Sequence, residues 1–405
     1  MPRVIHVLRK FDPREWGGIE THLAGLVPAL SRLGWESEVH APAEDGTDGA
    51  PLEALGARFR TFRAFYPYLA LRPEQRRDLV AAGGNLVAPG ELASLLGSEA
   101  DVLHTHTLRR LGGVVRSAAR LRGRPYAVTV HGPVHTDPGI ERDAAARTRG
   151  ARDLGAPFGL LVGARRVIDD ADLVFVLNGE EHRALLPVRG DRHLAHVAHG
   201  VELSRASTSA RAAARESIAG LGAAPYAVVL ARIDPMKSQE TAIAAFLAAA
   251  PREMHLLLVG AFVDRAYERR LRALANDEPR VHFVGGVSPS RARALLAEAH
   301  LALIPSRAEP FGIVLLEAWA EGTPALVADV GGLSDLCRGN GAEAALVTSG
   351  EDWSARLAAA LADAAFLERE RVEGPRRVAA RYSWDALARR TVDAYARSAA
   401  RRPAQ

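Results

Sequence analysis

The chain has 405 residues, 48% hydrophobic and 25% charged, a length and composition typical of a globular protein with room for two full cores. Its formal net charge of +4 favours acidic ligands only weakly and does not require nucleic acid as a partner. One cysteine excludes an internal disulfide, and no apolar run reaches the roughly 18 residues that span a membrane, so we expect a cytoplasmic protein.

The first 41 residues predict the opening unit of an α/β fold. Residues 4–8 form an apolar segment that is too short for a signal peptide and typical of a buried strand. Helical spacing of apolar residues over 19–33 predicts a helix, and a second strand is predicted at 37–41. The first turn carries Gly17 and Gly18 without the third glycine of a G-x-G-x-x-G fingerprint, which disfavours a nicotinamide dinucleotide.

Residues 43–100 show less regular patterns. The segment 59–77 interleaves aromatic residues with arginines. This pattern fits a packed loop whose arginines reach water, and also an acceptor-binding flap, a membrane-surface patch or a nucleic-acid contact. Residues 88–97 predict a short helix.

Two histidines and a basic helix follow. Residues 101–107 predict a strand in which His104 and His106 share one face, as a metal-binding pair would. No third ligand is placed near them, so we expect no metal there. The next segment predicts a helix with an ordinary solvated basic face, formed by Arg109, Arg116 and Arg120.

Another strand is predicted to end at His131, after which come a helix near 157–169 and a strand at 171–178. Ligands bind beyond the carboxyl ends of parallel strands, so His131 is a candidate site residue, although a capped loop residue would look the same. Asp170 and Asp172 spell D-x-D, a pattern that holds a metal-bound diphosphate in other enzymes. Their place before a buried strand instead favours the turn at the end of a helix.

Residues 227–246 predict a strand, a loop and a helix, with Arg232 at the end of the strand and Lys237 at the start of the helix. Two fixed cations can hold a diphosphate and stabilise it as a leaving group without a metal, and each charge-assisted bond contributes about 1.5–3 kcal/mol. The alternative is a pair of surface cations with Asp234 as their partner.

Residues 301–328 predict a strand, a loop, a helix opening at Phe311 and Gly312, and a second strand. Glu309 and Glu317 stand eight residues apart across the junction of loop and helix. Free N–H groups at a helix start suit phosphate. Glu317 falls among apolar residues, where a carboxylate is costly unless it is paired or faces a polar cleft.

The segment SRAEPFGIVLLEAWAEGTPALVADVGG, residues 306–332, resembles the E-x7-E signature of retaining GT-B glycosyltransferases, family 4 (group 1 glycosyltransferases). Three further segments resemble motifs of that family, so the resemblance runs nearly end to end: the Gly-Gly loop, TVHG at 129–132 and R-x-D-x-x-K at 232–237. The sequence departs from the family pattern at Ser238, which replaces a common glycine, and at His199, which replaces a common asparagine.

The resemblance implies roles for individual residues. It assigns the ribose hydroxyls of a nucleotide-sugar to Glu317 and the donor sugar to Glu309, and it places His131 near that sugar. It implies that the donor is bound by Gly17, Gly18, Arg232, Lys237, Glu309, Phe311, Gly312, Ile313, Val314 and Glu317. The residues expected to act in catalysis are His131, Glu309, Arg232 and Lys237, with no metal and no cofactor.

The resemblance also implies the fold: an α/β protein of the GT-B type, with two Rossmann-like domains whose parallel sheets face a central cleft. We expect an acceptor-side domain at 1–202, a nucleotide-sugar-binding domain at 203–381, and a terminal helix at 382–405 that crosses back to the first domain. The expected reaction is retaining, metal-independent transfer of a sugar from a UDP-sugar, or secondly a GDP-sugar, to an acceptor hydroxyl.

Two alternatives remain on the same fold, a nucleotide-sugar hydrolase or epimerase and a non-catalytic nucleotide-sugar-binding protein. The acceptor is expected to be a small molecule or a glycan. We expect no nucleic-acid partner, and peripheral membrane contact stays open as a less favoured alternative.

Overall fold

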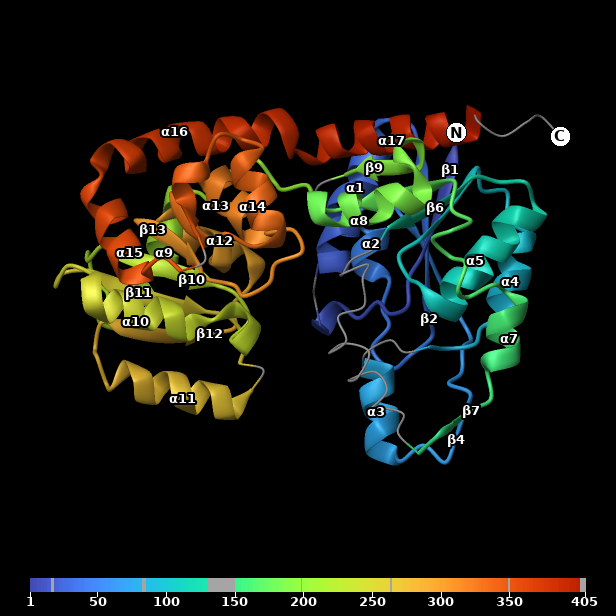
Figure 1. Cartoon of the computed structure of the whole chain (residues 1–405), viewed down its shortest axis with the longest axis horizontal. Helices are drawn as coiled ribbons and strands as arrows, with labels where there is room; N and C mark the ends of the chain where they lie inside the picture. Colours follow the sequence, from blue (N-terminus) through green and yellow to red (C-terminus); the bar gives the residue numbers. More distant parts are fainter. Residues whose placement is uncertain are drawn as a thin grey trace. The chain divides into compact units, whose positions relative to one another are not determined.

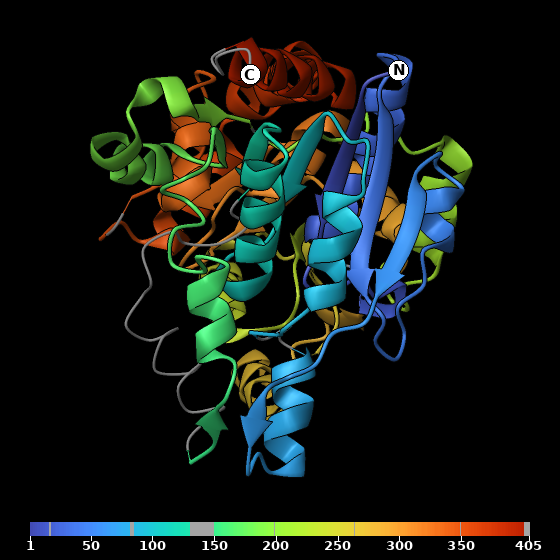
Figure 2. The ribbon, with the colours of Figure 1, turned by 90° about the vertical axis from the view of Figure 1, so that its right-hand side faces the viewer.

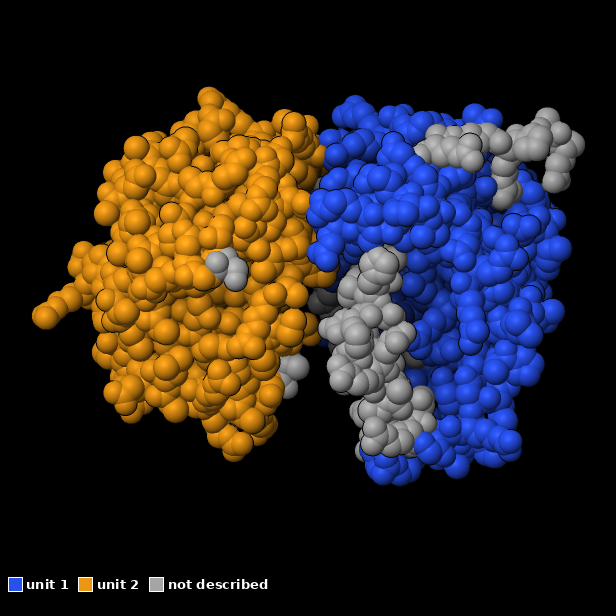
Figure 3. All heavy atoms as spheres, viewed as in Figure 1, with its two compact units in different colours: residues 1–200, 384–405 blue, residues 201–383 orange. Residues whose placement is uncertain are grey.

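The computed structural model describes residues 1–15, 18–81, 85–129, 150–197, 199–262, 264–348 and 350–400. The chain divides into two compact units, which we call unit 1 (residues 1–200 and 384–405) and unit 2 (residues 201–383) (Figure 3). The boundaries that we expected at 202/203 and 381/382 lie two residues from these divisions. The terminal helix α17 (Trp384–Ala400) belongs to unit 1.

Unit 1 is built on a parallel sheet of seven strands in the order β3-β2-β1-β5-β6-β8-β9 (Figure 1). The central strands of this sheet are mostly buried, as expected for a sheet covered on both faces, whereas the edge strand β3 exposes three of its five residues. The sheet strands are β1 (Arg3–Val7), β2 (Glu36–Pro42), β3 (Arg58–Phe62), β5 (Val102–Thr105), β6 (Tyr126–Thr129), β8 (Leu173–Val176) and β9 (Leu194–His196). A separate antiparallel pair joins β4 (Tyr68–Leu69) to β7 (Arg152–Asp153).

The helices of unit 1 cover both faces of this sheet. Side chains alternate along β1, so that Ile5 packs toward α5 and Val4 packs toward α1 and α17. Helices α4 and α5 lie on the face nearer the viewer in Figure 2. The helices of this unit, besides α17, are α1 (Gly18–Arg32), α2 (Ala50–Glu53), α3 (Pro73–Ala81), α4 (Pro89–Leu96), α5 (Arg109–Leu121), α7 (Ala156–Leu161) and α8 (Gly179–Arg189), with short 3-10 turns η1 (Pro13–Glu15) and η2 (Asp191–His193).

Unit 2 has a parallel sheet of six strands in the order β12-β11-β10-β13-β14-β15. The strands are β10 (Tyr226–Leu230), β11 (His255–Val259), β12 (Val281–Gly285), β13 (Leu301–Ile304), β14 (Ala325–Ala328) and β15 (Leu346–Val347). The helices are α9 (Thr208–Glu216), α10 (Gln239–Ala249), α11 (Arg265–Ala275), α12 (Pro289–Ala297), α13 (Ile313–Glu321), α14 (Gly331–Arg338), α15 (Trp353–Ala362) and α16 (Ala364–Arg381), with 3-10 turns η3 (Pro235–Lys237) and η4 (Glu343–Ala345). Two parallel α/β units confirm the predicted fold class.

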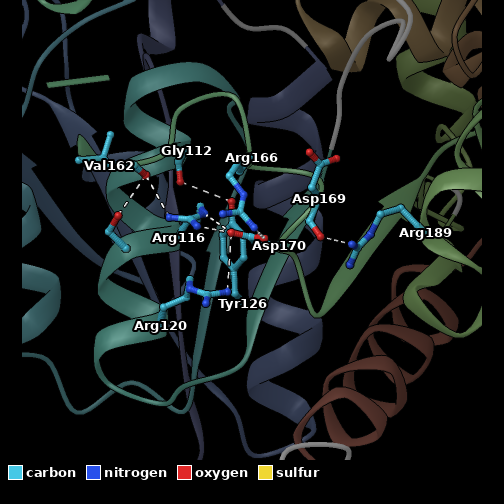
Figure 4. Close-up of polar contacts among 10 residues, drawn as sticks. Gly112, Arg116, Arg120, Tyr126, Val162, Arg166, Asp169, Asp170 and Arg189 are labelled. Atoms are coloured by element: carbon cyan, nitrogen blue, oxygen red, sulfur yellow. Dashed lines mark hydrogen bonds and ion pairs between the residues drawn. The ribbon is translucent and has the colours of Figure 1, made fainter. Parts of the chain in front are cut away.

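The basic helix α5 presents only part of the solvated face that its spacing predicted, since Arg109 and Arg120 are exposed and Arg116 is not. Arg116 is buried, and its guanidinium forms an ion pair with Asp170, which also accepts from Arg166 at 2.9 Å (Figure 4). Arg120 is exposed as expected and reaches the same carboxylate only at 3.7 Å. The prediction was wrong for Arg116 because its partner is supplied by a segment 54 residues away.

The D-x-D carboxylates are both held by the protein. Asp172 accepts a hydrogen bond from the backbone N–H of Tyr126 at 2.9 Å. Asp170 forms the ion pairs with Arg116 and Arg166 described above. The turn that contains Asp170 follows a shorter helix than predicted, since α7 ends at Leu161 and Gly163 adopts a positive φ of 66°. The motif is therefore part of the structural framework of unit 1, in agreement with its interpretation as a turn.

Candidate active site

The predicted site residues of unit 2 come from the ends of two neighbouring strands. β10 and β13 are paired in parallel, so the loops that follow them begin at the same edge of the sheet. The loop after β10 carries Lys237, and the loop after β13 carries Glu309. Their side chains meet in an ion pair, with Lys237 Nζ 2.6 Å from Glu309 Oε2. The two side chains are 22% and 17% exposed, so the pair is sheltered but reachable.

Arg232 stands on the same loop as Lys237 and is 67% exposed, with its guanidinium 3.8 Å from the Asp234 carboxylate. Asp234 also caps η3, since its Oδ1 accepts from the Met236 N–H at 2.8 Å. A solvent-exposed ion pair at this distance contributes less than about 1 kcal/mol, so the Arg232 charge is available to a ligand. Asp234 is therefore a weak partner of Arg232, and Lys237 pairs with Glu309 instead. Lys237 ends η3 rather than opening the helix α10.

The segment between the two glutamates is shaped by glycines. Gly312 caps α13 with a φ of 97°, a conformation that favours glycine. The Gly332 N–H donates to the Glu309 carbonyl at 2.8 Å. The backbones approach so closely that a Cβ on Gly332 would lie 2.4 Å from Phe311 Cα. Helix α13 begins directly after this turn. The N–H groups of its first residues, Ile313 and Val314, have no acceptor within the helix and can donate to a ligand.

We expect Gly332→Ala to lower the free energy of unfolding by about 2 kcal/mol or more, because the added methyl group meets backbone atoms that cannot move aside independently. Urea unfolding followed by circular dichroism measures the effect. Gly90→Ala is the control, since Gly90 lies in helix α4 and its Cβ would meet nothing within 4 Å. Equal stability of the two variants would show that the 309–312 turn is not packed as described.

Glu317 lies in the second turn of α13 and is partly buried. Burial raises the pKa of Glu317 to about 7, with Arg293 opposing the shift and Glu321 adding to it. Arg293 forms its ion pair with Glu321 rather than Glu317, at 2.5 Å. Among the described residues, no group donates a hydrogen bond to the Glu317 carboxylate. It is therefore a sheltered acceptor that suits the hydroxyl groups of a ligand.

The raised pKa of Glu317 has a consequence for stability. Between the unfolded value of 4.5 and about 7 the folded chain binds more protons than the unfolded chain, so this residue lowers stability as the pH rises through that window. Glu317→Gln, which imitates the protonated acid, should stabilise the protein by about 1–3 kcal/mol at pH 8 and have little effect at pH 5. Urea unfolding at both pH values tests this; the same effect at pH 5 and pH 8 would show that Glu317 does not titrate in the window.

The other predicted donor-binding residues are placed as follows. Phe311 is buried, so only its backbone remains to meet a ligand. Gly18 begins α1, and its carbonyl contacts His199 Nε2 at 3.2 Å. Gly17 and His131 lie outside the described residues, and their predicted roles stay predictions.

The structure places a third histidine beside His104 and His106, which the sequence did not indicate. His6 on β1 is opposite His104 in the strand register, and ligand atoms of all three buried rings lie within 4.8 Å of one another. The nitrogens of His104 already contact the Tyr395 hydroxyl and Thr129 Oγ1, each at 2.7 Å. His6 Nδ1 contacts His106 Nε2 at 3.0 Å, and burial lowers the pKa of His6 to about 3. The contact between His6 and His106, together with the contacts of His104 to Tyr395 and Thr129, makes this buried cluster part of the core of unit 1.

In the part of the chain that the structure describes, no helix combines the length and the apolar character that crossing a bilayer requires.

Comparisons with known proteins match a segment of each unit to a family model. Residues 212–375 match the family model "Glycosyl transferases group 1", and residues 17–200 match "Glycosyl transferase 4-like domain". D-inositol 3-phosphate glycosyltransferase 2 of Catenulispora acidiphila is 30% identical over 400 residues, which cover 94% of this chain and 90% of that protein. The D-inositol 3-phosphate glycosyltransferase of Nocardia farcinica is 33% identical over 310 residues, 73% of this chain and 66% of that protein.

A similar solved structure is that of HepE from Anabaena, determined with UDP and glucose. It superposes with a TM-score of 0.69 at 19% identity, covering 97% of this chain and 99% of that one. The likeness at this identity concerns the fold. The sequence relationship and the fold together show that the chain belongs to the group 1 glycosyltransferases and has their GT-B fold.

Proposed function

We propose that this glycosyltransferase takes its sugar from a nucleotide-diphosphate donor held by unit 2, and that fixed cations replace a metal in stabilising the diphosphate. The observation that carries the proposal is the arrangement of Lys237 in contact with Glu309, with the available charge of Arg232 on the same loop. Both loops leave the carboxyl edge of the sheet, where ligands of α/β folds bind.

The leaving group is stabilised by charge in this proposal. Arg232 and Lys237 contact the diphosphate, and the N–H groups of Ile313 and Val314 add the donors of a helix start. Lys237 exchanges the Glu309 carboxylate for phosphate when the donor binds. Such contacts gain strength as negative charge develops on the diphosphate in the transition state, which lowers the barrier to transfer.

The two glutamates orient the donor. Glu309 accepts hydroxyl hydrogen bonds from the sugar, and Glu317 accepts them from the ribose. Glu317 in its ionised form accepts more hydrogen bonds than in its protonated form, so donor affinity should rise as the pH increases through about 7. His131 is proposed to contact the sugar.

We propose that the anomeric configuration is retained by a front-face route. Retention by double displacement requires a carboxylate nucleophile close to the anomeric carbon. In this proposal Glu309 orients the sugar hydroxyls, so it is not assigned the role of that nucleophile. In the front-face route the departing diphosphate oxygen accepts the proton of the acceptor hydroxyl, and the acceptor oxygen forms its bond on the face that the leaving group vacates.

The proposed donor is a UDP-sugar, with a GDP-sugar second, and the proposed acceptor is a small molecule with a free hydroxyl. The structure of HepE with UDP supports the choice of uridine. The names of the two relatives, which refer to D-inositol 3-phosphate, support a phosphorylated cyclitol as the first acceptor to test.

The proposal is tested by calorimetric titration of UDP, GDP and ADP in the presence of a chelator. One diphosphate should bind in the micromolar range, and Arg232→Ala and Glu317→Ala should each weaken it at least ~10-fold, equivalent to 1.4 kcal/mol. Arg376→Ala is the matched control, an arginine 71% exposed on α16 of the same unit. Binding of none of the three, or binding indifferent to both site variants, would contradict the proposed site.

A further inference from the structure

We propose that Gln239 is a positioning residue that sets the conformation of the loop carrying Arg232 and Lys237. The inference rests on the proposed function, because it assumes that these two cations meet the diphosphate. Gln239 is the first residue of α10 and is completely buried. It matches no motif recognised in the sequence.

One side-chain amide contacts both sides of the turn that follows β10. The Gln239 Nε2 donates to the Arg232 carbonyl at 2.8 Å, and its Oε1 accepts from the Asp234 N–H at 3.4 Å. The donor and acceptor of the amide are thus both used on backbone groups two residues apart. An apolar side chain of the same size would leave these backbone groups without their partner.

The loop needs such a support at Arg232, because this functional side chain does not hold the backbone that carries it, whereas Lys237 is paired with Glu309. The side chain of Arg232 is 67% exposed, so its direction depends on the backbone beneath it. Ile233 anchors the turn to the sheet, since its N–H donates to the Ala261 carbonyl at 2.9 Å. Ser238 at the far end of the loop adopts a positive φ of 52°, where the family commonly has glycine. Gln239 holds the backbone on both sides of Ile233, at Arg232 and Asp234.

The same helix start also reaches the second loop of the site. Glu240, next to Gln239, accepts from the Arg307 guanidinium at 2.8 Å, and Arg307 lies two residues before Glu309. Tyr267 on α11 braces both residues, because its hydroxyl contacts the Gln239 Oε1 at 3.2 Å and the Glu240 carboxylate. Gln239, Glu240 and Tyr267 therefore fix the position of the Arg232–Lys237 loop relative to the loop that carries Glu309.

The test compares Gln239→Met with Tyr226→Phe in the full-length chain. Tyr226 is an equally buried residue of unit 2 at the opposite end of β10, and its hydroxyl donates to the Leu295 carbonyl at 2.6 Å. Both variants lose buried hydrogen bonds. Calorimetry with the nucleoside diphosphate that the wild type binds should show affinity about 10-fold weaker for Gln239→Met and unchanged for Tyr226→Phe.

A double-mutant cycle separates positioning from a general loss of stability. If Gln239 acts through Arg232, then Arg232→Ala should weaken binding by about 3-fold or less in the Gln239→Met background, compared with ~10-fold in the wild type. A merely structural role predicts the same factor in both backgrounds, and that additivity would overturn the proposal.

Tyr267→Phe provides a second route if Gln239→Met does not fold. It removes only the hydroxyl that braces Gln239 and Glu240, and it should weaken diphosphate binding about 3-fold. Wild-type affinity in the Tyr267 variant would then overturn the proposal. A wild-type protein that binds no diphosphate would instead contradict the proposed function, and the positioning role would fall with it.

Discussion

Glu309→Gln should bind a nucleoside diphosphate about 5- to 10-fold more tightly than the wild type and yet transfer sugar at least ~100-fold more slowly. The carboxylate holds Lys237 at 2.6 Å and lies beside the place proposed for the diphosphate. Its neutralisation frees the lysine and removes a repulsion from the bound anion. The sugar at the same time loses the acceptor that orients it.

Lys237→Met should have the opposite effect on binding, weakening the diphosphate at least ~10-fold, and the same effect on transfer. Misfolding would weaken diphosphate binding in both variants. Tighter binding by Glu309→Gln together with weaker binding by Lys237→Met therefore cannot be explained by misfolding. Calorimetry at low ionic strength measures the affinities, and Glu373→Gln on α16, whose partner Arg376 is 71% exposed, is the control. Weaker binding by Glu309→Gln would place this carboxylate away from the diphosphate.

Asp170→Asn should lower the free energy of unfolding by about 3 kcal/mol without altering diphosphate affinity. Burial acts to raise the pKa of Asp170, and the hydrogen bond and charge of Arg116 outweigh it, so the pKa lies below its usual range. Asparagine keeps the volume of the side chain but leaves the guanidinium of Arg116 buried beside a neutral group.

The variant also tests what the D-x-D pattern does. Asp172→Asn should lower the free energy of unfolding by less than Asp170→Asn does, because the amide oxygen of the new asparagine can still accept from the Tyr126 N–H, as the carboxylate does at 2.9 Å. Urea unfolding and calorimetry of both variants complete the comparison. Loss of metal-dependent donor binding in both, with stability unchanged, would contradict the structural role.

The parallel sheets were predictable because strands buried on both faces appear as short apolar runs. Segments such as LALI at β13 and ALVA at β14 show this directly. The sequence placed Lys237 and Glu309 in one donor site but did not predict their contact, which depends on the pairing of β10 with β13. The strand β3 was not predicted, because it carries exposed arginines at the edge of the sheet.

Local sequence patterns did not predict the contacts between segments that are distant in sequence. Arg116 looked like the neighbouring surface arginines until Asp170 was placed against it. His6 joins two histidines 98 and 100 residues away only through the pairing of β1 with β5, in which it faces His104. Which of the two glutamates in α13 takes Arg293 was also undetermined, since Glu317 and Glu321 both fall among apolar residues. Gln239 gave no signal because its role depends on two backbone groups of a folded turn.

The proposed metal-independent transfer is tested most directly by a transfer assay in the presence of a chelator. UDP-sugars and GDP-sugars are the donors, and D-inositol 3-phosphate is the first of the small-molecule acceptors. Mass spectrometry identifies the products of the wild type and of Lys237→Met. We expect one glycosylated acceptor and one nucleoside diphosphate per turnover without added metal, and at least ~100-fold less of both from the variant. Release of free sugar at an unchanged rate without acceptor, or transfer only after a divalent metal is restored, would contradict the proposed metal-independent transfer.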